Sequence, residues 1–112
     1  MHAVDIERTG RVVVVWASGE LDAFAVTDLE AAFAEVGEER RIVADLERVS
    51  FMDSTALGVL VRRVRELREA NADVRVVLPR GTARRIFEIT ALDGVLPVVA
   101  DRAVALDEID PA

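Results

Sequence analysis

The residue best suited to chemistry is Ser54, in the middle of the run Asp53-Ser54-Thr55. An apolar stretch at residues 42–46 precedes the run and is typical of a buried strand, whereas apolar residues at helical spacing follow it. Asp, Ser and Thr favour helix N-termini because their side-chain oxygens accept hydrogen bonds from N–H groups that lack an intrahelical partner. The positive end of the helix dipole also favours an anion there, including a phosphate on the hydroxyl itself. The residues alone leave open whether this run is a plain helix cap or a phosphorylation site.

A third interpretation makes Ser54 the nucleophile of a small serine hydrolase, because strand-to-helix turns present such serines. The nucleophile would need a general base, and the only histidine is His2, near the N-terminus. All other basic side chains are arginines, which stay protonated, and the G-x-S-x-G pattern is absent. The chain has no cysteine, which excludes thiolate nucleophiles, disulfides and Cys-ligated metals. We therefore expect no catalytic residue and keep the hydrolase as a remote alternative.

Sites for nucleotides and metals are not indicated either. Neither G-x-x-x-x-G-K-[ST] nor G-x-G-x-x-G occurs, and H-E-x-x-H is missing. The scattered Asp and Glu residues are expected to form solvated surface. The sequence therefore predicts no cofactor and no metal site.

The predicted helix after Ser54 carries a glycine and several arginines. Gly58 lies one turn beyond Ser54 on the same side and costs roughly 1 kcal/mol of helix propensity relative to alanine. Two explanations stay open: a partner approaches closely there, or the helix packs closely on the sheet. The arginines are expected to form a solvated face beside the buried apolar stripe; they are Arg62, Arg63, Arg65 and Arg68.

Length and charge limit the possible classes of protein. The 112 residues are expected to form one domain, 1–112, with a frayed tail at 107–112. A net charge of −7 argues against nucleic acid as a partner and leaves room for a basic protein partner. No apolar run is long enough to span a bilayer, and the N-terminus lacks the basic and apolar regions of a secretory signal. We expect a cytoplasmic protein with no membrane partner.

Strand and helix patterns alternate along the chain. Together they predict a single α/β domain with a mixed, mainly parallel sheet of four to five strands, packed with about four helices. The first two strands are expected to form an antiparallel hairpin. Strands are expected at 3–7, 12–17, 42–46, 73–78 and 96–99, with a break at 18–22. Helices are expected at 26–36 (capping box Thr27-x-x-Glu30), 54–70 (cap Asn71), about 83–90 (cap Thr82) and 101–106.

Three stretches together resemble a known family. Gly19-Glu20-Leu21-Asp22 is similar to its G-E-L-D motif, residues 43–60 to its central D-L-x-x-V-x-F-M-D-S-[ST]-G-L-G segment, and residues 86–93 to a later helix and turn. These are features of the STAS domain of bacterial anti-sigma factor antagonists. The resemblance covers nearly the whole chain and implies the STAS fold.

The resemblance also implies a function. In such proteins the serine after the aspartate is phosphorylated by a partner anti-sigma factor, which is a serine kinase of the histidine-kinase-like ATPase type. That serine is Ser54 here, and Thr55 is the alternative acceptor. The unphosphorylated antagonist binds the anti-sigma factor and frees a sigma factor, and a phosphatase resets the phosphorylated form. The partner-binding residues implied by the matched motifs are Gly19, Glu20, Asp22, Phe51, Met52, Asp53, Ser54, Thr55, Ala56 and Gly58.

One position departs from the family pattern. The glycine that follows the Ser-[ST] pair is Ala56 here, and its methyl group is expected near the phosphoacceptor, where it would alter the approach of the kinase. Some relatives of this domain are scaffolds or subunits of lipid-transport systems without a phosphorylation cycle, which is the main alternative function. Phe51 and Met52 are expected to be exposed in the loop before Ser54.

Overall fold

Five strands form one mixed sheet in the order β1-β2-β3-β4-β5, and three helices pack against it in the part of the chain that the computed structural model describes. That part comprises residues 1–78, 81, 84–85 and 96–110. Apart from residues 84–85, which are helical, the predicted third helix falls outside it, as do its cap Thr82 and the stretch 86–93 of the family resemblance. The elements are β1 His2–Thr9, β2 Val12–Leu21, α1 Val26–Val36, β3 Arg41–Met52, α2 Ser54–Glu69, β4 Asp73–Val77, β5 Val98–Val99 and α4 Arg102–Ile109.

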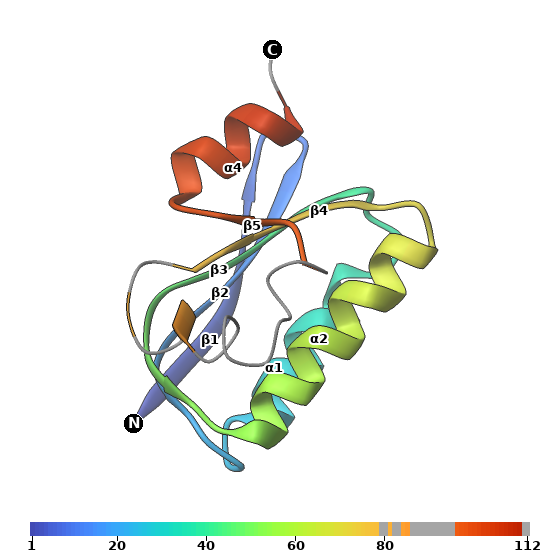
Figure 1. Cartoon of the computed structure of the whole chain (residues 1–112). Helices are drawn as coiled ribbons and strands as arrows, with labels where there is room; N and C mark the ends of the chain where they lie inside the picture. The colour runs from blue at the N-terminus through green and yellow to red at the C-terminus, as the bar shows by residue number, and fades with distance from the viewer. Residues whose placement is uncertain (79–80, 82–83, 86–95, 111–112) are drawn as a thin grey trace.

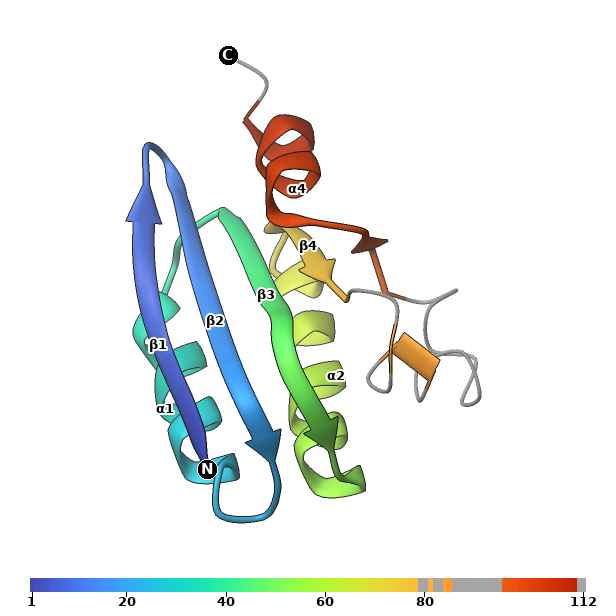
Figure 2. The same cartoon turned by 90° about the vertical axis from the view of Figure 1, so that its left-hand side faces the viewer.

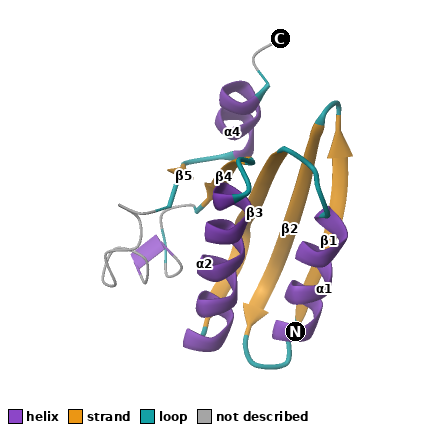
Figure 3. Cartoon of the chain, turned by 90° about the vertical axis from the view of Figure 1, so that its right-hand side faces the viewer, coloured by secondary structure: helices purple, strands orange, loops and turns teal. Residues whose placement is uncertain are grey.

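The sheet has a helix layer on each face. Helices α1 and α2 lie side by side on one face, and α4 lies on the other (Figures 1 and 3). The β1–β2 pair is the predicted antiparallel hairpin, and the remaining neighbours are parallel. The α/β class with a mixed, mainly parallel sheet is therefore confirmed. No helix within the described ranges is long and apolar enough to cross a membrane.

The run of four valines in β2 explains why this strand is central. Val13 and Val15 pack under α1 and α2, whereas Val12 and Val14 face the cluster under α4, and all four are at most 2% exposed. Alternate residues of a strand point to opposite faces, so a β-branched run buried on both sides needs cover from two layers. The two helix layers supply that cover.

Two strands are longer than their sequence patterns predict. The sequence predicts a break in the strand at 18–22. This prediction is wrong for residues 18–21, which continue β2 and pair with β3. Likewise β3 runs to Met52 and does not end near residue 46. Register shifts lie between Trp16 and Ser18 and between Gly19 and Glu20, so β3 has extra residues at both places. Such bulges change which face a side chain meets, which obscures the alternation from which strands are predicted.

The predicted helix boundaries agree with the structure better than the predicted helix caps do. Helix α1 has the predicted bounds, but the capping box is wrong: Ala25 is the N-cap and no side chain caps the helix. The C-cap of α2 is Ala70, and Asn71 follows it with a positive φ of 67°. Helix α4 continues to Ile109, which is 4% exposed, so the tail is ordered further than predicted.

Candidate functional site

The carboxyl ends of β2 and β3 bring two sequence motifs together. Leu21 pairs with Met52, and the Asp53 N–H donates to the Leu21 carbonyl at 3.0 Å. Helix α2 begins at this edge of the sheet, next to the loop that leads from β2 into α1 (Figure 2). The Gly19–Asp22 motif and the Asp53-Ser54-Thr55 run are therefore neighbours, although 30 residues separate them along the chain.

Asp53 caps helix α2. Its Oδ1 accepts a hydrogen bond from the Ala56 N–H at 2.9 Å, and its carbonyl accepts the first intrahelical bond, from Leu57, at 3.0 Å. Ser54 and Thr55 come next, at the first two helical positions, and both are exposed. Their hydroxyls make no hydrogen bond with any residue that the structure describes. The fold thus uses the aspartate as the cap and leaves both hydroxyls accessible.

Two of the predicted contact residues are buried. Met52 is 2% exposed and Ala56 is fully buried, and both belong to the core under α1 and α2. The expectation that Met52 is exposed in a loop is wrong, because β3 continues to Met52, which pairs with Leu21 and lies in the same core cluster as Val49. The side chain of Ala56 likewise lies in the core, so its methyl group is not on the surface that presents Ser54 and Thr55.

Aromatic side chains lie exposed at the same edge. Phe51 is 43% exposed at the end of β3, and Phe24 is 85% exposed in the loop after β2. The Phe24 N–H donates to Asp22 Oδ1 at 3.0 Å, which shapes this loop as an Asx turn. Phe24 was not a predicted contact residue; the signal in the sequence is a large aromatic residue that fits neither the strand nor the helix pattern. Exposed aromatic residues at one place are typical of a protein-binding surface.

Gly19 and Glu20 are adjacent in β2 but differ in what they contribute at this edge. Gly19 has a φ of +78°, and a Cβ there would overlap the backbone oxygen of Met1, so a glycine is needed for β1 to pair with β2. Glu20 is exposed, and its carboxylate lies 3.9 Å from the terminal ammonium of Met1. Only Glu20 of this pair presents a side chain to solvent.

An open groove runs along the exposed side of α2 from Ser54. Gly58 is exposed, and a Cβ there would meet no atom within 4 Å, so the explanation that this glycine packs on the sheet is wrong. The groove has a volume of about 600 Å³. Its lining residues are Ser54, Thr55, Leu57, Gly58, Val59, Val61, Arg62 and Arg65.

The arginines of α2 are not all part of a solvated face. Arg63 is only 32% exposed and binds Glu30 of α1 through Nε and Nη2, each at 3.1 Å. Arg62 shares the same carboxylate at 3.1 Å. The hydrogen bond from Arg63 lowers the pKa of Glu30 despite its partial burial, and the same bond raises the pKa of Arg63. These contacts link the two helices on one face of the sheet.

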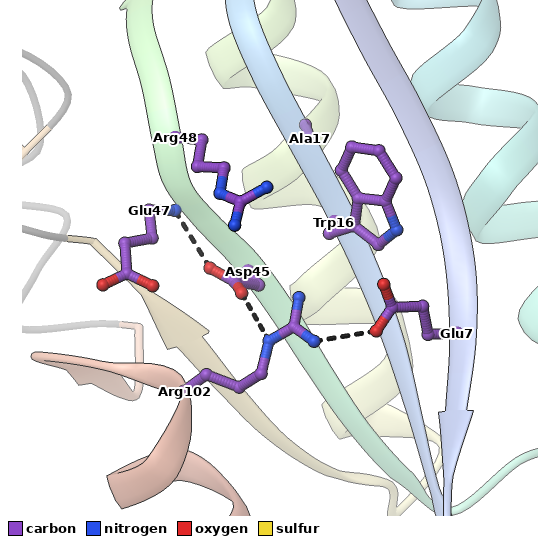
Figure 4. A pocket seen from close by; sticks show the side chains of 7 residues that line it. All are labelled: Glu7, Trp16, Ala17, Asp45, Glu47, Arg48 and Arg102. Atoms are coloured by element: carbon purple, nitrogen blue, oxygen red, sulfur yellow. Dashed lines mark hydrogen bonds and ion pairs between the residues drawn. The ribbon is translucent and has the colours of Figure 1, made fainter.

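A second charged cluster lies on the opposite face of the sheet. Asp45 is 5% exposed; its carboxylate accepts hydrogen bonds from Arg102 Nε at 2.7 Å and from the Glu47 N–H at 3.0 Å (Figure 4). Arg102 also binds Glu7 at 2.8 Å. Burial alone would lower the pKa of Arg102, but the hydrogen bonds to both carboxylates outweigh it and raise the pKa. This cluster lines a cavity of about 330 Å³ and ties α4 to the sheet.

His2 makes its side-chain contact with helix α1. Its Nε2 lies 2.8 Å from Asp28 Oδ2 on α1. Within the described ranges, no three His, Asp or Glu side chains gather as metal ligands. The start of α2 presents exposed hydroxyls at the same sheet edge as the exposed Phe51 and Phe24.

The chain is similar in sequence to a known domain family and to several of its members. A family model for the STAS domain matches residues 3–105. The chain is similar to the anti-sigma-B factor antagonist of Staphylococcus aureus (strain NCTC 8325 / PS 47), with 34% identity over 82 residues, 71% of this chain and 76% of that protein. It is also similar to the anti-sigma F factor antagonist of Lysinibacillus sphaericus, with 32% identity over 104 residues, 90% of this chain and 88% of that protein.

Solved structures agree with the sequence matches. An anti-sigma factor antagonist from Mycobacterium paratuberculosis superimposes with a TM-score of 0.87 at 28% identity, over 97% of this chain and 94% of the other. The Bacillus cell fate determinant SpoIIAA in its phosphorylated form gives a TM-score of 0.71 at 30% identity, over 96% of this chain and 99% of the other.

Proposed function

This chain belongs to the STAS domain family, and we propose that it is an anti-sigma factor antagonist that is switched by phosphorylation of Ser54. In this proposal the unphosphorylated chain binds an anti-sigma factor that is a serine kinase, and a sigma factor is released. The kinase then transfers phosphate from ATP to Ser54 and the complex dissociates. A phosphoserine phosphatase returns the chain to its binding form. The names of the related proteins support the antagonist role.

The observation that carries the proposal is the position of Ser54. Its hydroxyl is exposed at the first position of α2, while Asp53 makes the cap. The N–H groups of Ser54 and Thr55 precede the first intrahelical bond, from Leu57 to Asp53, so they can donate to a phosphate. A phosphate of about −1.5 to −2 charge is thereby accommodated without unfolding the helix.

The switch acts through charge at the binding surface. The added phosphate lies beside the Asp53 carboxylate, at the same edge as Asp22 and Glu20. A partner surface that fits a neutral hydroxyl between these carboxylates meets repulsion and a larger desolvation cost after phosphorylation. Binding therefore falls while the fold stays the same.

The test is phosphorylation by a cognate kinase. The purified chain is incubated with ATP, magnesium and each candidate anti-sigma kinase from the same genome, and the phosphorylated residue is mapped by mass spectrometry. We expect phosphate on Ser54; Ser54→Ala abolishes it, and Ser50→Ala, a control at another exposed serine, does not. Phosphate that persists in Ser54→Ala and disappears in Thr55→Ala would assign the threonine instead.

Binding measurements test the switch itself. We expect Ser54→Ala to bind the kinase throughout the reaction, and Ser54→Asp to lose tight binding with an unchanged circular dichroism spectrum. Tight binding by Ser54→Asp contradicts the switch. Binding without any phosphate transfer favours a scaffold or a transport-system subunit.

A further inference from the structure

The exposed side of α2 presents one continuous stripe that starts at the phosphoacceptor. Ser54, Gly58, Arg62 and Arg65 are spaced by four, four and three residues, so they lie on the same side of the helix. At 1.5 Å per residue, Arg65 lies about 16 Å along the helix from Ser54. The groove of about 600 Å³ follows this stripe. A segment bound in it would therefore reach well beyond the hydroxyl.

Gly58 leaves the helix without a side chain in the middle of the groove lining. A glycine inside a helix costs roughly 1 kcal/mol relative to alanine. The fold does not need it here, because a Cβ would meet no atom within 4 Å and the residue has no positive φ. What the missing side chain provides is access, since a partner backbone can approach the helix closely between Ser54 and the arginines.

The charge of the groove differs from that of the whole protein. Its lining contains two arginines and no carboxylate, although the chain carries a net charge of −7. Arg62 shares Glu30 with Arg63, which already holds both oxygens of that carboxylate. Arg65 is exposed and makes no ion pair with any residue in the described ranges. The groove thus has positive charge that the fold itself does not neutralise.

Resting on the proposed function, we propose that this groove binds an acidic segment of the anti-sigma factor kinase. The segment lies along α2, approaches closely at Gly58 and places carboxylates on Arg62 and Arg65. Because a guanidinium pairs with a carboxylate through two parallel hydrogen bonds, the contact sets the position of the segment as well as its affinity. Arg65 is too far from Ser54 to touch the phosphate, so it acts on binding and not on phosphoryl transfer.

The test is charge reversal at Arg65, measured with the kinase that phosphorylates the wild-type chain. We expect Arg65→Glu to raise the Kd about tenfold at low salt, and the difference from wild type to shrink at high salt. Its KM for phosphorylation should rise with kcat unchanged. The matched control is Arg40→Glu, an exposed arginine before β3 with the same charge change, which should leave the Kd within about twofold.

Each outcome decides between the claims. Recovery of Arg65→Glu binding by a Glu→Lys or Asp→Lys change in the kinase supports the acidic segment. If the wild-type chain is phosphorylated and Arg65→Glu binds as tightly as Arg40→Glu, the groove proposal is overturned and the proposed function stands. If no kinase binds or phosphorylates the wild-type chain, both fall.

Discussion

Asp53 and Ala56 are joined across the first turn of α2, where Asp53 Oδ1 accepts the Ala56 N–H at 2.9 Å. This bond satisfies one of the N–H groups that a helix leaves open at its start. It also separates two tasks that the sequence places side by side, because the residue that caps the helix is not the residue proposed to be modified.

The first prediction concerns this division of roles. Asp53→Ala should lower the free energy of unfolding by about 1 kcal/mol, because it removes the cap. Asp53→Asn should retain most of the stability, since asparagine caps equally well. Ser54→Ala should stay within about 0.5 kcal/mol of wild type. Urea denaturation measures all three, and a cost at Ser54 equal to that at Asp53 would show that the hydroxyl takes part in the cap.

Gly58 should show opposite effects on stability and on binding. Gly58→Ala should raise the free energy of unfolding by up to about 1 kcal/mol, because the added methyl meets no atom and alanine favours the helix. The same methyl stands where a partner would approach, so the Kd for the kinase should rise. Thermal denaturation and titration calorimetry measure the two effects. A stabilised variant with unchanged affinity would remove Gly58 from the binding surface.

Phe24 is predicted to anchor the partner without supporting the fold. It is 85% exposed, so Phe24→Ala should leave the free energy of unfolding within about 0.5 kcal/mol of wild type. Loss of an exposed aromatic anchor should raise the Kd for the kinase about tenfold or more. The control is Val104→Ala, a 40% exposed apolar residue on α4, which should not change the affinity. Equal effects of both substitutions on affinity would contradict this role.

The contact between α1 and α2 should depend on pH. The folded-state pKa of Glu30 lies below its ordinary value of 4.5, mainly through the hydrogen bond from Arg63. Its contribution to stability is therefore complete above pH 4.5 and is lost as the pH falls through the lowered folded-state pKa. Urea denaturation should show Glu30→Gln less stable than wild type at pH 7, with the difference shrinking below pH 4.5. Glu35→Gln, at an exposed position on α1, should show no such dependence.

Patterns that repeat along the chain predicted most of the fold. The four valines of β2 indicated a central strand, and Val26, Leu29, Phe33 and Val36 indicated α1 with its correct bounds. Periodicity works at these places because burial acts on every turn of a helix and on both faces of a central strand. The bulges in β3 break the two-residue period, which is why residues 47–52 did not look like a strand.

Contacts between segments that lie far apart in the chain could not be predicted from the sequence. The Asp45–Arg102 pair joins residues that lie 57 positions apart, and neither residue stands out among the charged residues of the chain. The same is true of Glu30 and Arg63, so the arginines of α2 looked like a uniform solvated face. Phe24 was missed for a related reason, because exposure of a single aromatic residue depends on how its loop is held, here by Asp22.

The burial of Ala56 divides the most conspicuous motif of the chain into two kinds of position. Met52 and Ala56 are buried in the core. In contrast, Phe51, Ser54, Thr55 and Gly58 are exposed and can contact another protein. If paralogous chains are compared over every residue of the motif, residues that are needed for folding are therefore counted together with residues that determine which partner binds. The extent to which such a chain binds the partners of its paralogues should depend on the exposed residues of the motif alone. A glycine-to-alanine exchange at position 56 should leave that partner choice unaffected.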